Sequence, residues 1–150
     1  MTTTSPELER LLRVLRAQRA LLGELEACTA RRSAALEDPD ALLGAMNHRD
    51  ALIARVEAQS REVDDAHAAW VRVRGPHDHP GDVEDVRVLA DELAASLARI
   101  EAADQRDASA LRDRRQALAD QIEGVVRAGR AGRAYAPSGH TPARYQDTEG

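Results

Sequence analysis

The histidines and carboxylates around position 77 are the first candidates for chemistry in this chain. The sequence reads His77-Asp78-His79, with His67 upstream. Two imidazoles and a carboxylate are ligands that Zn²⁺ accepts, but structural zinc sites usually take paired Cys or His side chains from two separate segments. No second pair stands elsewhere in the sequence. Solvated His and Asp are also common in loops with Pro and Gly, so we expect no metal and no cofactor, with His77 and His79 as the candidates if a metal does bind.

Patterns typical of enzymes are missing from the sequence. No Gly-rich phosphate loop follows a predicted strand, and no nucleophile stands with a plausible base. The only cysteine, Cys28, cannot form a disulfide within the chain and is expected to fill a helix face. Paired carboxylates are numerous, as on any charged helical surface. We therefore expect a protein that is not an enzyme.

Arginines and tyrosines near the C-terminus are candidates for recognising a partner. Arg127, Arg130 and Arg133 form a basic patch that suits phosphate or an acidic protein surface, or simply the negative end of a helix dipole. Tyr135 and Tyr145 are two of only three aromatic residues. Aromatic anchors suit segments that become ordered on binding, because they bury a large area with few rotatable bonds. Chance residues in a linker are the alternative.

Composition narrows the class of protein. The chain has 150 residues, enough for one domain, and much of its 43% apolar content is alanine. The formal net charge of −5 gives no general attraction to nucleic acid or anionic lipid. No signal peptide and no run of about 20 apolar residues is present, so we expect a cytoplasmic protein without membrane insertion.

Three long amphipathic helices must position all these residues. Apolar residues return at alternating spacings of four and three, which places them along one side of a helix. Examples are Leu8, Leu11 and Leu15 in the first run, and Ile53, Val56 and Val63 in the second. The predicted elements are helices over about 6–37, 39–74 and 82–128, forming a helical bundle over 1–128, and a flexible, disordered C-terminal tail over 129–150.

The expected boundaries come from residues that cap or break helices. Asp38-Pro39 ends the first helix and begins the second, and the Pro- and Gly-rich segment 75–81 is a loop. Asp82 is predicted to cap the third helix, and Gly129 and Gly132 are predicted to end it.

Short connections between long helices favour antiparallel neighbours, so the fold class is all-α, an elongated antiparallel three-helix bundle with coiled-coil-like seams. Polar residues fall on or near the apolar stripes and should interrupt these seams. They are Gln18, Thr29, Arg32, Arg49, Ser60, His67, Asp104 and Asp107.

The third helix is predicted to outrun the second near Ala117. Beyond that point Leu118, Ile122, Val125 and Val126 have no covering helix, which normally marks a partner site. Coverage by the tail, by a second copy of the chain or by the first helix is the alternative.

Three stretches of the sequence resemble the FlgN-type flagellar export chaperones. The first is Leu11-Leu12-Arg13-Val14-Leu15-Arg16-Ala17-Gln18-Arg19-Ala20-Leu21-Leu22-Gly23-Glu24-Leu25. The second runs from Arg31 to Glu57 and includes Asn47-His48-Arg49. The third is a Tyr after the last helix, a Gly/Pro spacer and Ala143-Arg144-Tyr145-Gln146-Asp147. The high Arg content and the His-rich loop are not features of that family.

This resemblance implies a cytoplasmic chaperone of flagellar assembly and type III secretion. Such a protein would bind helical terminal segments of hook-associated (axial) proteins, prevent premature polymerisation and deliver them to the flagellar export gate. Tyr135, Tyr145 and Arg144 would be the candidates for docking on the gate. The client-binding residues would be Leu111, Leu118, Ile122, Val125 and Val126.

A second class of function stays open at this point. The same apolar stripe would suit a homodimer or a larger homo-oligomeric scaffold or adaptor without a secreted client. Self-association of the protein would distinguish the two functions.

Overall fold

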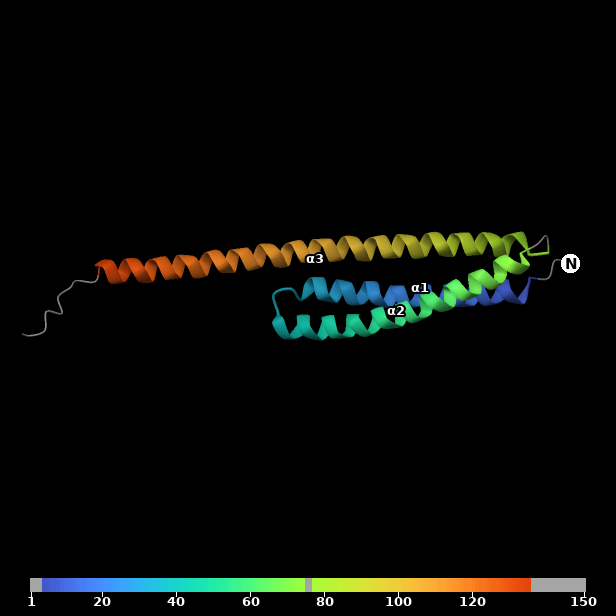
Figure 1. The fold of residues 1–150 in the computed structure, drawn as a ribbon, viewed down its shortest axis with the longest axis horizontal. Coiled ribbons are helices and arrows are strands. Elements are labelled where there is room, and N and C mark those ends of the chain that lie inside the picture. Colours follow the sequence, from blue (N-terminus) through green and yellow to red (C-terminus); the bar gives the residue numbers. More distant parts are fainter. Residues whose placement is uncertain (1–3, 75–76, 136–150) are drawn as a thin grey trace, which may run out of the picture. The chain divides into compact units, whose positions relative to one another are not determined.

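Three helices make up the fold, as the sequence predicts (Figure 1). The computed structural model describes residues 4–74 and 77–135, and these residues contain no strand. The helices are α1 (Pro6–Ala34), α2 (Pro39–Val73) and α3 (Pro80–Tyr135). The chain divides into two units, Met1–Ser109 and Ala110–Gly150, with the boundary inside α3. The all-α fold class is confirmed.

Helix α1 ends earlier than the sequence predicts. It begins where expected, with the Ser5 hydroxyl accepting a hydrogen bond from the Leu8 N–H at 3.3 Å. Its last residue is Ala34, whereas the expected end was residue 37. The reason is a turn that starts before Asp38, in which the Ala35 N–H donates to the Arg32 carbonyl at 3.0 Å. This turn frees Asp38 to cap the next helix.

Helix α2 has nearly the expected bounds. The Asp38 side chain accepts from the Ala41 N–H at 3.2 Å, and Pro39 occupies the first turn, where its missing N–H costs nothing. The helix ends at Val73, one residue before the predicted position.

Helix α3 is longer at both ends than predicted. It starts at Pro80, so Asp82 lies inside the helix, and the Asp82 N–H donates to the His79 carbonyl at 3.0 Å. At the other end the helix continues through Gly129 and Gly132 to Tyr135, whereas the expected end was residue 128. An isolated helical glycine costs only about 1 kcal/mol relative to alanine, which does not terminate a helix of good helix formers.

The predicted start of the tail at residue 129 is wrong. Residues 129–135 are helical, which corrects the predicted tail at its start. The rest of the predicted tail, residues 136–150 with Arg144 and Tyr145, lies outside the described residues.

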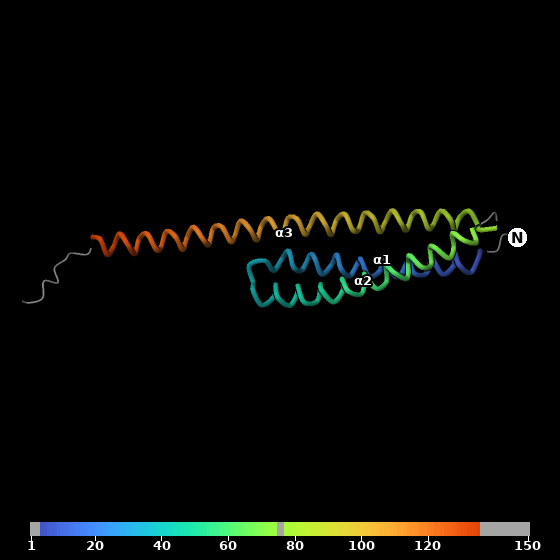
Figure 2. Tube along the Cα trace, in the orientation of Figure 1, coloured from blue at the N-terminus to red at the C-terminus, as the bar shows by residue number. Residues whose placement is uncertain are grey.

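Within the unit that ends at Ser109, α1 and α2 are antiparallel and the first part of α3 lies alongside them (Figure 2). Contacts along α1 fix this register. Gln18 Nε2 donates to Ser60 Oγ of α2 at 3.0 Å, and Arg19 pairs with Glu92 of α3 at 3.0 Å. From the start to the end of α1, the residue numbers of its partners on α2 decrease and those of its partners on α3 increase, as an up-down-up arrangement requires.

Two apolar clusters fill this unit, and α1 supplies most of each. One cluster joins four leucines of α1 to Ala66 and Trp70 of α2 and Leu89 of α3. The other joins three leucines and Cys28 of α1 to Leu52 of α2 and Ile100 of α3. Cys28 is fully buried, as expected for a residue that fills a helix face. Helix α1 is thus the central element of the core.

None of the helices in the described ranges is both long enough and apolar enough to cross a membrane.

Candidate functional site

Polar residues interrupt the seams of the packed unit, and most of them find partners there. The predicted seam residues Arg32, Arg49, Asp104 and Asp107 form one partly buried network. Arg32 Nη2 lies 2.8 Å from Asp104 Oδ1, and Arg49 Nη2 lies 2.6 Å from Asp104 Oδ2. Arg32 Nε donates to Asp107 Oδ2 at 2.9 Å. Two cations and two carboxylates balance, so the network joins α1, α2 and α3 without net charge.

The electrostatics of Arg32 follow from this arrangement. Burial alone would lower the pKa of Arg32, but hydrogen bonds and attraction from Asp104 and Asp107 outweigh it and raise the pKa. The guanidinium therefore stays charged at any working pH. Its role is to hold helices together, and no reactive group lies in the network.

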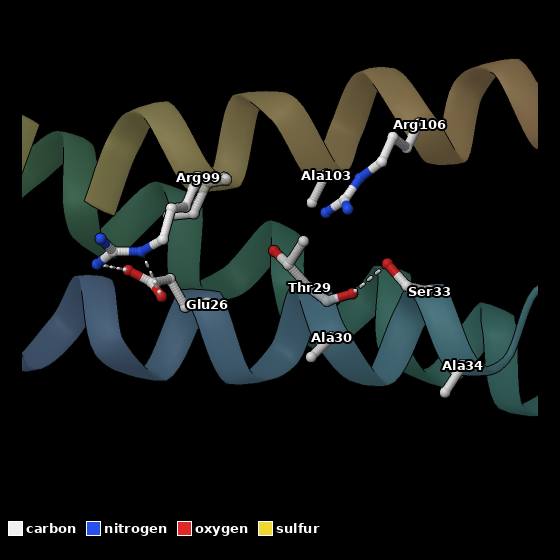
Figure 3. Close-up of a pocket in the computed structure, with 9 residues that line it drawn as sticks. Glu26, Thr29, Ala30, Ser33, Ala34, Arg99, Ala103 and Arg106 are labelled. Atoms are coloured by element: carbon white, nitrogen blue, oxygen red, sulfur yellow. Dashed lines mark hydrogen bonds and ion pairs between the residues drawn. The ribbon is translucent and has the colours of Figure 1, made fainter. Parts of the chain in front are cut away.

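A groove of about 530 Å³ opens between α1 and α3 beside this network (Figure 3). Its sides are small residues, Ala30 and Ala34 of α1 and Ala103 of α3, so the helices leave space between them. At one end Glu26 and Arg99 form an ion pair at 2.9 Å. Arg106 reaches in from α3. The groove follows from the small side chains that face one another on α1 and α3.

The carboxylate at the end of the groove is already satisfied. Hydrogen bonds from Arg99 and from the Ser96 hydroxyl lower the pKa of Glu26, although burial opposes them. A lowered pKa keeps Glu26 ionised at neutral pH, so it is unsuited to act as a proton donor there.

The His77–His79 segment has a structural role through its central carboxylate. Asp78 Oδ2 accepts from Trp70 Nε1 at 2.9 Å, and Asp78 Oδ1 accepts from the Ser5 N–H at 3.4 Å. His79 Nδ1 accepts from the Gly81 N–H at 3.0 Å. Across the described ranges, no three His, Cys, Asp or Glu side chains come together to hold a metal ion. Trp70 is buried at this end of the unit.

The predicted client-binding residues lie on α3, in the unit that begins at Ala110. Every described residue of that unit, 110–135, is exposed. Leu118, Ile122 and Val125 are 49%, 65% and 71% exposed. Their spacing of four and three residues puts them on one face of the helix. We call Leu111, Leu118, Ile122, Val125 and Val126 the 111–126 stripe.

An exposed stripe of this kind is unusual for a helix in water. Single exposed apolar residues are common, but contiguous apolar surface marks a site of interaction. Five exposed Leu, Ile and Val side chains follow one another over four to five turns of helix. Their burial against a partner would release the water that covers them, and each large side chain would contribute about 1.5–3 kcal/mol if fully buried.

The basic and aromatic candidates near the end of α3 are exposed as well. Arg127 Nη2 pairs with Glu123 Oε1 one turn earlier at 2.6 Å. Arg130 and Arg133 form no such pair with any residue of the described chain. Tyr135 ends the helix and is 86% exposed.

Sequence reasoning found the stripe but missed two features. The alanine-lined groove depends on how α1 and α3 pack, and no pattern of residues in the sequence predicts it. The distribution of charge around the stripe was readable from the sequence by the same periodicity that gave the stripe.

No protein-family model, no curated protein and no solved structure matches this chain.

Proposed function

We propose that this chain is a cytoplasmic chaperone of flagellar export. It would bind the helical terminal segments of hook-associated (axial) proteins, keep them from polymerising early and deliver them to the flagellar type III export gate. The observation that carries the proposal is the 111–126 stripe, an exposed apolar face on a helix. The sequence features shared with FlgN-type chaperones support it and suggest the client.

The mechanism is burial of one amphipathic helix against another. A client segment that needs a helical partner to cover its own apolar face would pack on Leu118, Ile122 and Val125. While covered, that face could not join other subunits, which is how binding would prevent premature assembly. No covalent step is involved, and release requires only that a competing surface cover the same client face.

Delivery to the gate would use groups outside the stripe. Tyr135 is exposed at the end of α3, so it is available while Leu118 to Val126 hold a client. Tyr145 and Arg144 are the other candidates for gate docking, and both lie outside the described residues. Separate residues for client and gate would let one chaperone hold both partners at once.

Calorimetry tests the client site directly. The full chain is titrated with terminal helical segments of hook-associated proteins from the same organism, and we expect a dissociation constant of about 1 μM or lower. Leu118→Asp combined with Ile122→Asp should weaken binding at least about 100-fold, because two apolar contacts of about 1.5 kcal/mol or more are each replaced by a charge that must be desolvated. The helical content by circular dichroism should stay unchanged.

The matched control carries the same kind of change on α2. Leu43→Asp combined with Met46→Asp alters two exposed apolar residues and adds the same charge. It should bind clients like the parent chain. Equal loss in both variants would place the client site elsewhere, and failure of every segment to bind the parent chain would refute the chaperone function.

The same variants decide the second candidate function. A homo-oligomeric scaffold would bury the stripe against another copy, so light scattering over a range of concentrations would show a larger species that Leu118→Asp with Ile122→Asp dissociates. A monomer at all concentrations contradicts the scaffold.

A further inference from the structure

The charges of residues 110–135 differ from those of the rest of the chain. This segment has six arginines and three acidic residues, a net charge of +3, within a chain of formal net charge −5. Residues 1–109 carry 14 arginines and 21 acidic residues, a net charge of −7. The exposed apolar stripe therefore lies on a basic helix, although the protein as a whole is acidic.

The acidic residues of this segment lie away from the stripe. At about 100° per residue, Asp113, Asp120 and Glu123 fall on the face opposite Leu118. Two of them already have partners on that face. Gln116 Nε2 donates to Asp120 at 3.0 Å, and Glu123 pairs with Arg127 at 2.6 Å.

The charged residues of this segment that lie closest to the centre of the stripe are arginines. Arg114, Arg115 and Arg133 fall within about 60° of its centre. Arg114 and Arg115 lie one turn before Leu118, and Arg133 lies two turns after Val126. Arg115 and Arg133 have no ion pair with any residue in the described ranges. Cations thus stand at both ends of the apolar surface.

We infer that the helix bound by the 111–126 stripe is acidic, with Asp or Glu residues near both ends of its own apolar face. This inference rests on the proposed function and adds the chemistry by which the client is chosen. In paired helices, charges that flank an apolar seam set partner choice and orientation. Arg115 and Arg133 would attract carboxylates at those ends and would repel a client with Lys or Arg there, so the apolar contact gives affinity and the arginines give selectivity.

A helical protein segment fits this surface better than a membrane or a second copy of the chain. Helices that lie on lipid carry a wide apolar face, usually with Trp or Phe, whereas this stripe is a narrow seam of Leu, Ile and Val with four–three spacing. A second copy packed stripe to stripe in parallel register would bring Arg115 against Arg115 and Arg133 against Arg133, which opposes such pairing.

Three model peptides test the inference. Each is an amphipathic helix of about 20 residues with the same Leu seam, and the positions that flank the seam are Glu, Gln or Lys. Fluorescence anisotropy measures their binding to the full chain at low and at physiological salt. We expect the Glu peptide to bind about tenfold more tightly than the Lys peptide at low salt, and the difference should shrink as salt screens the charges.

A charge reversal with a matched control makes the test specific. Arg115→Glu with Arg133→Glu should invert the preference, so that the Lys peptide binds more tightly than the Glu peptide. Arg112→Glu with Arg130→Glu makes the same change in net charge three residues earlier at each site, farther around the helix, and should keep the preference for Glu. An equal effect of both double variants would show that only overall charge matters and would overturn the inference.

The remaining outcomes separate this inference from the proposed function. Equal binding of the three peptides, abolished by Leu118→Asp with Ile122→Asp, overturns the acidic-client inference and leaves the chaperone function standing. Binding to phosphatidylglycerol vesicles but to no peptide, or a dimer that the stripe variant dissociates, also overturns it. The chaperone function itself fails only if terminal segments of hook-associated proteins do not bind.

Discussion

The two parts of α3 carry similar apolar spacing but use it differently. In residues 80–109, Leu89 and Ile100 are buried against α1 and α2, and Asp107 is buried in an ion network. In residues 110–135, Leu118 and Ile122 repeat the amphipathic pattern, and every residue is exposed. Spacing therefore shows that a face is built for packing, but it does not show whether the partner belongs to the same chain.

The two parts of α3 differ in how their charged residues are paired, although their apolar spacing is similar. In the packed unit, polar residues on the seams are balanced within the chain, as Arg32 and Asp107 are. Around the 111–126 stripe, Arg115 and Arg133 have no counterpart in the described chain. A balanced seam indicates an interior interface, whereas under the proposed function the charges that balance Arg115 and Arg133 would come from the client.

The largest expected difference between the two parts is in the cost of removing an apolar side chain. Leu22 of α1 is 1% exposed, so Leu22→Ala should lower the free energy of unfolding by about 4 kcal/mol through lost burial and the cavity left behind. Ile122→Ala, the control, should change it by less than about 0.5 kcal/mol. Denaturant unfolding followed by Trp70 fluorescence measures both, because the only tryptophan reports on the packed unit. A cost for Ile122→Ala near that for Leu22→Ala would show that the stripe is buried within the protein.

Removing a buried carboxylate should have the next largest effect. Asp107→Ala takes a partner from Arg32 and from Ser33, whose hydroxyl donates to Asp107 at 2.7 Å. The guanidinium of Arg32 then keeps only one of its two carboxylate partners. We therefore expect the free energy of unfolding to fall by about 3 kcal/mol.

Glu123→Ala is the control for that carboxylate. It removes one side of the exposed pair with Arg127 and should cost about 0.5 kcal/mol or less. Equal effects of Asp107→Ala and Glu123→Ala would mean that the network of the packed unit is as solvated as a surface pair.

Much of the fold was predictable because its signals are local. The start of α1 at Pro6 and the break at Asp38 and Pro39 come from residues whose backbone geometry or side chain leaves few alternatives. The polar seam positions were also predictable, since they interrupt a regular apolar spacing. Their mutual pairing required the register between helices, which places Arg49 of α2 and Asp104 of α3 at one level.

The predicted helix ends were wrong where the usual structural preference of one residue is outweighed by the preferences of neighbouring residues. Asp82 is a good capping residue, but Pro80 already fits the first turn, so the helix begins there.

Of the candidate site, the stripe was predictable from spacing alone, and its exposure is found in the structure. The groove between α1 and α3 was not predictable, because it depends on which alanines face one another across two helices.

Controls aside, the smallest expected effect concerns the end of α3, where the sequence-based prediction of a helix end was wrong. Gly129 and Gly132 are helical, and a Cβ atom added at either position would meet no atom within 4 Å. Gly129→Ala and Gly132→Ala should therefore each stabilise the local helix by about 1 kcal/mol, because alanine loses less backbone entropy than glycine in a helix. Amide hydrogen exchange over residues 125–135 should slow about fivefold for each substitution, with exchange around Leu22 unchanged.

Faster exchange in the variants would mean that these glycines hold a conformation that alanine cannot adopt, and the helix would then end at residue 128. Slower exchange would show that the segment carrying Arg130 and Arg133 is a continuation of the helix that presents the stripe, as the charge-based selection of an acidic client requires.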